Sequence, residues 1–346
     1  MRGSAGLWRR GLVSLACALA LFVLTPAAVA GEHRAAPLRL VNLNPFHLLY
    51  GVPAPFGSGV VPEGASEVIA SFDMASHLNS GRSGGERILM DGETYRQALS
   101  WRQGLGQGWE YFFEVPAVAH SAGAFDGFIE GWHDVFGLPQ GGRDTAPRDR
   151  LSLTYADGRT IRADVRRDVL SFGDASFGVG HALPSPPLQN DGMAVRAAVK
   201  LPTGDTDSLT GSGGFSASTW VETSGALPGS KESRRWLYAA TLGALAGTAP
   251  EGLPTAGHFI AFGGLGVTWR ALEDLQFTVQ VDAQSSPYGA SGLAALSDTA
   301  VILGMGGSLQ LTEHLVLDVA VTEDDGVHRS APDIGLHLAL RWRPQD

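Results

Sequence analysis

The chain has 346 residues, and its 35 acidic residues outnumber its 25 lysines and arginines, which gives a formal net charge of −10. Phosphate backbones repel such a protein, so nucleic acid is excluded as a partner. The mean hydropathy is +0.04, and after residue 30 no apolar run approaches the ~18 residues of a membrane-spanning helix, so that only a barrel of strands could cross a membrane.

The first thirty residues predict a cleaved secretory signal peptide. Three arginines precede an apolar run of 14 residues, GLVSLACALALFVL, and Ala-Val-Ala at 28–30 has the small-x-small pattern of a signal peptidase site. The alternative is a transmembrane anchor, but the run is shorter than the ~20 apolar residues that an anchor needs. Cleavage would also remove Cys17, the only cysteine. The exported chain would then hold neither a disulfide nor a thiolate metal site.

Residues 31–65 are predicted to form an N-terminal extension that lies in the periplasm or plugs a lumen, and residues 66–346 to form a barrel. Apolar and polar residues alternate through this second region, as they do in strands with one apolar face. An outer-membrane barrel has an even number of strands, so we predict 12, with 14 as the alternative, and expect 150–180 to hold one strand fewer or more than the pattern suggests. The segments with strand pattern are 66–76, 93–103, 108–118, 150–156, 159–165, 192–201, 214–223, 235–246, 257–269, 275–284, 298–311, 314–322 and 333–343.

The alternation suits both a soluble sandwich, with its apolar face inside, and a membrane barrel, with its apolar face toward lipid. Short turns at 104–108, 271–274 and 312–313 contrast with long links at 119–149 and 285–297, which is typical of short periplasmic turns and long outer loops. Tryptophans beside the short turns suit a membrane interface. We therefore predict an all-β protein, a closed antiparallel transmembrane β-barrel in the outer membrane. Its predicted aromatic girdle consists of Trp101, Trp109, Trp269 and Trp342.

The polar faces of the strands are expected to line the lumen. A barrel of about 12 strands lies between ~8 strands, which leave no space inside, and ~16, which leave a water channel. We therefore expect a narrow passive channel or a transport-related barrel for small solutes. The alternative is a structural or surface-interaction barrel with a filled lumen. The predicted lumen-lining residues are Arg196, Lys200, Gln280, Asp282, His337 and Arg341.

Three segments and the alternating C-terminal half carry a family resemblance. NLNPFHLLYGVP (42–53), GFIEGWHDVFGLPQGGRD (127–144) and VKLPTGD (199–205) resemble the proteobacterial outer-membrane proteins of the domain of unknown function 3187 family. The resemblance covers about residues 40–346, and its [FY]-G-[LV]-P element occurs twice. It implies an outer-membrane barrel and supplies no reaction. The chain departs from usual barrels at its C-terminus, where four residues follow the aromatic Trp342.

A short amphipathic helix is predicted in the longest outer link. Its apolar residues recur at helical spacing, and it would either gate the barrel mouth or pack on the rim or the membrane interface. The second interpretation is favoured, because aromatic stripes at this spacing usually pack. The stripe consists of Phe125, Phe128, Ile129, Trp132 and Phe136.

Signals for enzymatic activity are weak, and no enzyme is predicted. HLNSGR (77–82) is similar to the His-x-Ser-Asn-Gly-Arg run of outer-membrane phospholipases, but His77 and Ser80 would lie on opposite faces of a strand, so a lipid hydrolase is only a remote alternative. We interpret this stretch as a polar strand end followed by a Gly-rich loop.

No cofactor and no metal are predicted, because the ten histidines show no metal-ligand spacing. Acidic loops at 204–208 and 323–326 could hold calcium or bridge to lipopolysaccharide, although solvated acids are the default interpretation. The predicted partners are outer-membrane lipid, lipopolysaccharide and, during biogenesis, the barrel-assembly machinery.

Overall fold

The computed structural model describes residues 36–123, 150–184, 190–230, 234–250, 253 and 258–344. Within these ranges, no helix is long and apolar enough to cross a membrane.

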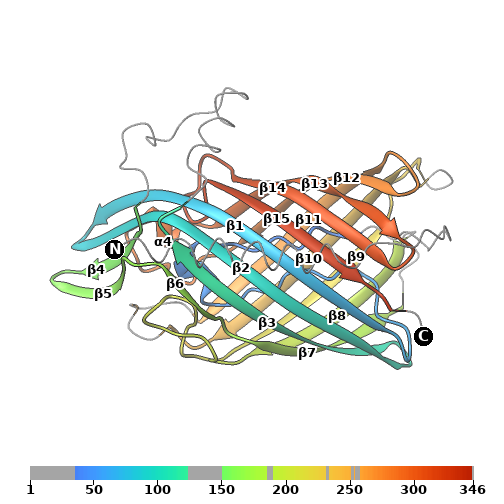
Figure 1. Cartoon of the computed structure of the whole chain (residues 1–346), viewed down its shortest axis with the longest axis horizontal. Helices are drawn as coiled ribbons and strands as arrows, with labels where there is room; N and C mark the ends of the chain where they lie inside the picture. The colour runs from blue at the N-terminus through green and yellow to red at the C-terminus, as the bar shows by residue number, and fades with distance from the viewer. Residues whose placement is uncertain are drawn as a thin grey trace, which may run out of the picture.

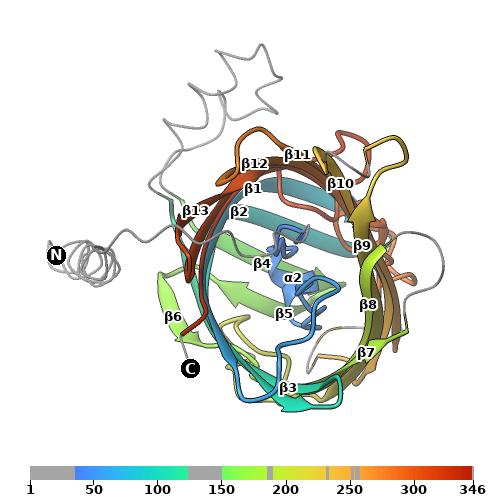
Figure 2. The same ribbon diagram turned by 90° about the vertical axis from the view of Figure 1, so that its right-hand side faces the viewer.

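Twelve antiparallel strands close into a barrel, as predicted (Figures 1 and 2). Closure comes from β1 and β15, which pair from Val68↔Trp342 to Ser76↔Ile334. The barrel strands are β1 (Ser66–Ser83), β2 (Glu86–Gly106), β3 (Trp109–Ser121), β7 (Ser176–Leu183), β8 (Asn190–Lys200), β9 (Ser216–Ala226), β10 (Trp236–Gly247), β11 (Phe259–Arg270), β12 (Leu275–Gln284), β13 (Ala300–Thr312), β14 (Leu315–Asp324) and β15 (Ile334–Trp342).

The number 12 is confirmed, but two of the predicted segments lie outside the barrel. The segments at 150–156 and 159–165 form β4 (Ser152–Asp157) and β5 (Thr160–Val165), a hairpin that pairs with the first residues of β2. β6 (Val169–Phe172) pairs with β3 near the C-terminal end of that strand. The barrel strand that the pattern missed is β7. Its inward positions 178 and 180 are glycines, so it shows no apolar-polar alternation.

β1 and β2 are much longer than predicted, with 18 and 21 residues. The stretch 77–82, interpreted as a strand end and a loop, continues the ladder to a turn at Gly84 and Gly85, both at positive φ. The prediction of a loop there was wrong, because backbone pairing with β2 extends the strand regardless of side-chain polarity. With β4 and β5, this extension projects beyond the barrel (Figure 1).

The two ends of the barrel differ in their connections. One end has short connections at 107–108, 271–274 and 313–314, and the first and last barrel residues lie there; we call it the turn end. The opposite end, the loop end, carries the longer links 201–215 and 285–299, the latter with the short helix α4 (Ala294–Ser297).

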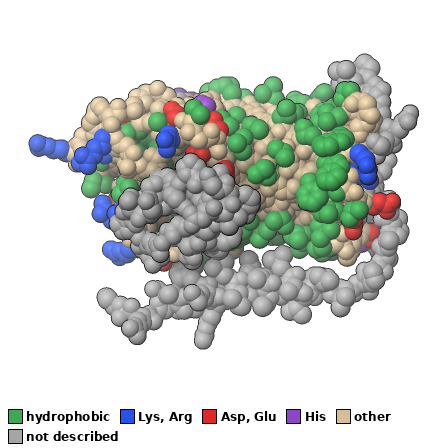
Figure 3. All heavy atoms as spheres, turned by 90° about the horizontal axis from the view of Figure 1, so that it is seen from above, with side chains coloured by type: hydrophobic (Ala, Val, Ile, Leu, Met, Phe, Trp, Pro, Cys, Tyr) green, Lys and Arg blue, Asp and Glu red, His purple; other side chains and the backbone are tan. Residues whose placement is uncertain are grey.

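Apolar side chains of the strands point outward. Leu242, Leu265 and Val279 are 73%, 58% and 60% exposed, whereas the polar Gln280 next to Val279 is 2% exposed. Figure 3 shows hydrophobic side chains spread over the barrel wall, with charged side chains gathered toward its ends. The wall is therefore apolar outside and polar inside, which is the reverse of a soluble sandwich.

Residues 36–65, which we call the plug, lie inside the barrel except for the exposed residues 62–64 before β1 (Figure 2). The plug rises from the turn end, forms the short helix α2 (Pro45–Leu48) at the loop end and returns to β1. Asn44 caps α2, because its Oδ1 accepts a hydrogen bond from the Phe46 N–H at 3.0 Å. Gly51, at φ +68°, follows the helix at the point where the chain reverses.

The apex of the plug packs into an apolar core at the loop end. Phe46, Leu49 and Tyr50 are buried there with Tyr155 of β4 and Leu296 of α4. The β4–β5 hairpin and the loop-end links thus cover the apex. A second, smaller apolar cluster joins Leu38 and Leu40 of the plug to Ala300 and Ile302 of β13. Buried polar and charged side chains such as Glu67 and Arg102 lie toward the turn end.

Candidate functional site

Phe56 of the plug lies among three arginines in the lumen. The guanidinium carbons of Arg39, Arg102 and Arg196 lie 4.1, 4.7 and 5.6 Å from the centre of its ring. Each cation is attracted to the π-face, but three like charges at such distances repel one another. The wall must therefore supply anions.

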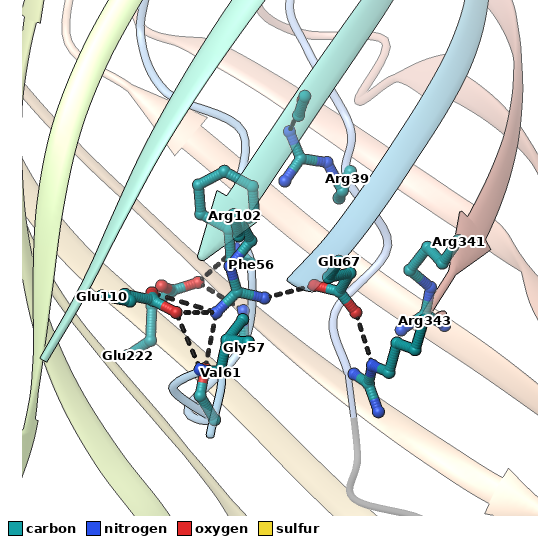
Figure 4. A network of polar contacts seen from close by, with 12 residues as sticks. Arg39, Phe56, Gly57, Val61, Glu67, Arg102, Glu110, Glu222, Arg341 and Arg343 are labelled. Atoms are coloured by element: carbon teal, nitrogen blue, oxygen red, sulfur yellow. Dashed lines mark hydrogen bonds and ion pairs between the residues drawn. The ribbon is translucent and has the colours of Figure 1, made fainter. Parts of the chain in front are cut away.

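Glutamates of neighbouring strands supply the counter-charges (Figure 4). Arg196 pairs with Glu110 at 2.8 Å and with Glu222, and Arg102 pairs with Glu110 at 2.8 Å and with Glu67 at 2.5 Å. All these side chains are at most 3% exposed. Buried charges of this kind are tolerated only when they are paired and hydrogen-bonded. The cluster is therefore one cooperative unit. We call it the lower cluster, because its strand residues lie near the turn end.

The lower cluster holds the backbone of the plug. Glu222 Oε1 accepts hydrogen bonds from the N–H groups of Phe56 and Gly57, both at 2.8 Å, and Glu110 accepts one from the Val61 N–H at 2.9 Å. Arg196 donates to the carbonyl oxygens of Gly57 and Gly59 at 2.7 Å. Arg102 donates to the Gly59 carbonyl at 2.8 Å. The wall thus binds both donors and acceptors of one short stretch.

A second ionic group, the upper cluster, includes an arginine of the plug. Arg39 pairs with Glu114 of β3 at 2.7 Å, and Arg96 of β2 pairs with the same carboxylate. Arg96 also lies 3.5 Å from Asp73, whose other oxygen contacts His337 Nδ1 at 2.6 Å. Withdrawal of Arg39 would leave Glu114 with one counter-charge fewer.

The ascending part of the plug lies against a smooth region of wall. The side-chain amide of Gln280 donates to the Leu38 carbonyl and accepts from the Leu38 N–H, both at 2.9 Å. Inward positions 264, 266, 304 and 306 of β11 and β13 are glycines. Leu40 packs on Gly304, where a Cβ atom would lie 3.7 Å from Leu40 Cγ and closer still to Cδ1. The missing side chains make the room that the plug fills.

The loop end holds the apex of the plug by polar contacts as well. The amides of Asn42 and Asn44 donate to the Ser330 carbonyl at 3.1 and 3.2 Å, and His47 Nε2 contacts the Leu296 carbonyl at 3.1 Å. Burial lowers the pKa of His47 to about 4, so this imidazole is neutral near pH 7. The apex therefore docks without a charge.

Cavities beside the plug are large at the turn end and small elsewhere. Two cavities of 430 and 350 Å³ lie where Ser58 to Pro62 face the wall near the turn end. Three others, farther along the plug, have volumes of 70, 40 and 10 Å³. These three hold a few water molecules at most, since one water occupies about 30 Å³ of liquid.

All six predicted lumen residues lie on the inward face, but their contacts are with the plug, with loops or with one another. Gln280 binds Leu38 and also donates to Asp282 at 2.7 Å. Lys200 contacts Asp174, Ser212 and the Gly214 carbonyl at the loop end. Arg341 pairs with Asp318. Arg196 and His337 belong to the lower and the upper cluster, respectively.

The four predicted girdle tryptophans lie near the turn end of their strands. Trp109, Trp269 and Trp342 are between 40% and 45% exposed. Trp236, which the prediction omitted, stacks on Trp269 with ring centres 6.3 Å apart. The predicted helix stripe from Phe125 to Phe136 lies outside the described residues.

His77 and Ser80 lie on opposite faces of β1. His77 is buried and contacts the Thr94 hydroxyl at 2.9 Å, while Ser80 is exposed. The histidine is therefore not placed to take a proton from this serine.

Sequence reasoning missed Arg39, Phe56, Arg102, Glu110 and Glu222. A signal for three of them existed. Arg102, Glu110 and Glu222 lie in predicted strand segments, and they alternate with outward apolar or aromatic residues such as Trp101 and Trp109. Nothing local marks Phe56.

Comparison with solved structures finds membrane barrels. The fold is similar to the KdgM porin in complex with disordered oligogalacturonate (5% identity, 81% of this chain and 99% of that chain, TM-score 0.41). It is also similar to the NanC porin (11% identity, 80% of this chain and 99% of that chain, TM-score 0.41). A third similar structure is the Pseudomonas putida toluene transporter TodX (10% identity, 93% of this chain and 99% of that chain, TM-score 0.39). No curated protein matches the sequence. A family model described as "Protein of unknown function (DUF3187)" matches residues 12–343.

Proposed function

The chain belongs to the DUF3187 family of proteins of unknown function, and we propose that it is an outer-membrane channel for small solutes whose lumen is closed by the plug. The observation that carries the proposal is the way in which the plug is held. At the lower and upper clusters, wall side chains bind the plug through ion pairs and hydrogen bonds, in addition to the apolar contacts of Leu38 and Leu40 with the wall. The polar contacts can be exchanged for water or solute.

The path of the plug also supports a movable closure. The plug enters and leaves at the turn end, so it can retract toward that end without threading through the barrel. The cavities of 430 and 350 Å³ already lie there. Displacement of the plug would join them to the glycine-lined region near Gly304.

The outer membrane fits the apolar exterior and the tryptophans near the turn end. The predicted signal peptide and the short connections support a turn end that faces the periplasm, with outer-membrane lipid and lipopolysaccharide around the wall and the barrel-assembly machinery acting during biogenesis. We assign the protein no catalytic reaction. Cell fractionation should recover it with the outer membrane, and recovery as a free periplasmic protein would contradict this location.

The channel proposal can be tested by locking the plug. Leu40→Cys and Gly304→Cys place two thiols where Leu40 now packs on Gly304. Cys17 lies in the predicted signal peptide, so this pair is expected to be unique in the exported chain. In planar bilayers the reduced protein should show brief openings, and oxidation should abolish them. Leu40→Cys alone is the control.

The runner-up is a structural barrel with a permanently filled lumen. The apolar core around Phe46, Tyr50 and Tyr155 favours it, because this core buries the plug apex under the loops. Absence of current from the reduced double variant and from the parent chain would support this alternative. Equal currents in the oxidised and reduced forms would show that passage does not depend on the plug.

A further inference from the structure

The proposed channel leaves open which solute its lumen recognises. Resting on the proposed function, we propose that the lumen wall is a binding site for the main chain of a peptide. The plug occupies this site within the same chain. Short peptides with small side chains are the solute class that replaces it.

The first observation is the pattern of contacts between 56 and 61. Carboxylates accept from the N–H groups of Phe56, Gly57 and Val61, and guanidiniums donate to the carbonyls of Gly57 and Gly59. These are six hydrogen bonds to the main chain when the Arg102 bond to Gly59 is included. Negative groups meet donors and positive groups meet acceptors along one short stretch of main chain, which bends at Ser58 and has Gly57 at φ +93°.

A separate contact repeats the pattern on the opposite wall. The Gln280 amide binds both the N–H and the carbonyl of Leu38 at 2.9 Å. This is the paired donor-acceptor contact by which one strand recognises another. Gly266 and Gly304 flank Gln280 in the ladder and leave space for the backbone to approach.

Half of the bound stretch consists of small residues. Positions 57 to 59 are Gly-Ser-Gly, and only Phe56 inserts a large group, between the arginines. The wall therefore recognises mainly amide groups and small side chains, and the Ser58 hydroxyl also contacts the Ser224 hydroxyl at 2.6 Å.

Peptides also fit the energetics of the emptied lumen better than hydrocarbons. Once the plug leaves, Glu110, Arg196 and Glu222 keep their ion pairs but lose their main-chain partners, which water or a solute must replace because unsatisfied polar groups are costly. A hydrocarbon offers no hydrogen bonds to replace them. A peptide that can adopt the same bend offers N–H and C=O groups to each of these side chains.

The experiment converts the plug into a separable ligand after the full chain has folded. Gly64 is exposed, its φ is +80°, and nothing lies within 4 Å of the position that a Cβ atom would take there. A protease site inserted after this residue allows the chain to be cut in detergent. A fluorescent peptide with the sequence of residues 36–62 is then added. Its exchange into the barrel is followed by fluorescence anisotropy.

Methylated peptides test recognition of the backbone. N-methylation at Gly57 and Val61 removes two donors to buried carboxylates and should weaken binding at least ~10-fold, since each such hydrogen bond is a strong one. N-methylation at Val60, whose N–H takes no part in the six main-chain hydrogen bonds, is the control and should have little effect. A hexapeptide of alanine and glycine should compete with the labelled peptide, whereas a linear oligosaccharide and toluene should not.

Three outcomes would overturn the proposal: no exchange of the labelled peptide into the cut protein, equal binding of all methylated forms, or equal competition by the oligosaccharide. These readouts measure binding, whereas the disulfide lock measures current. Peptide binding without current would overturn the channel and leave the peptide site standing. Current without peptide binding would do the opposite.

Discussion

Arg196 is the residue on which the lower cluster depends most. Its guanidinium pairs with Glu110 and Glu222 and also donates to two carbonyl groups of the plug. It is buried without access to water, so its charge is balanced only by these neighbours. Loss of the guanidinium would leave two carboxylates close together in the lumen, which is far more costly than loss of an exposed charge.

We therefore predict that Arg196→Met destabilises the folded barrel by about 3–5 kcal/mol, the usual cost of removing one partner of a buried pair. The exposed Arg159 of the β4–β5 turn is the matched control, and Arg159→Met should change stability by less than about 0.5 kcal/mol. Urea titrations of refolding into lipid vesicles measure both. Equal costs would mean that the lower cluster is not a stabilising unit.

His47 gives the docking of the plug a dependence on pH. Its pKa is about 4 in the folded protein because burial disfavours the charged imidazole, and the ordinary value is 6.5. The stabilising effect of the neutral form is complete above pH 6.5 and is lost as the pH falls toward 4. The loss amounts to roughly 3 kcal/mol.

His47→Gln should remove this dependence, because the amide keeps a hydrogen-bond donor but does not titrate in this range. Unfolding by urea at pH 7 and pH 4.5 should show a smaller difference for the variant than for the parent. Other groups titrate in both proteins, so the comparison isolates His47. An identical pH effect in the two proteins would contradict the assignment.

At the scale of elements, β7 is a barrel strand without apolar-polar alternation, and its neighbours determine its position. Phe177 and Val179 point outward. Gly178 and Gly180 face inward, where the side chains of other strands lie close to them. Their missing side chains admit Phe112 and the lower cluster. β7 therefore depends on long-range fit rather than on its own alternation.

Gly178→Ala should destabilise the barrel by about 1–3 kcal/mol, because the new Cβ would collide with the Phe112 ring and lie 2.5 Å from the Ala197 carbonyl oxygen. Gly289→Ala is the matched control, since nothing lies within 4 Å of its Cβ position. Thermal unfolding of both variants compares their stability with that of the parent protein. A neutral Gly178→Ala would mean that the wall can yield at β7.

At the scale of the whole molecule, the barrel has an apolar outer wall, two ionic clusters inside and an apolar core at the loop end. The plug connects these parts, because it contacts the loop-end core, the glycine-lined wall and both clusters. Opening would therefore need coordinated loss of contacts along the plug. Such coupling favours a barrel that is closed at rest.

The outer wall can be tested independently of the plug. Val279→Arg places a charge in the middle of the apolar face of β12 and should cost about 2–4 kcal/mol in lipid. Val327→Arg, at a 73% exposed position in the loop-end link 325–333, should cost little. Refolding titrations into vesicles compare them, and equal costs would mean that lipid does not contact Val279.

Much of the architecture was predictable from local pattern. Alternation in 275–284 identified the apolar face of β12, because side chains of a strand point to opposite sides whatever their neighbours are. The even strand number followed from the need to return to the starting side of the membrane. Both statements depend only on chain geometry and on the contrast between lipid and water.

The tertiary structure alone decided what fills the lumen. The sequence left residues 31–65 either in the periplasm or in the lumen, since a polar inward face is compatible with water, loops or a plug. Arg39 meets Glu114, and Gly57 meets Glu222, only after the barrel has closed around them. Local pattern marks a side chain as inward, but the partner of a buried charge is set by which strands become neighbours across the closed barrel, and that is a long-range property of the whole chain.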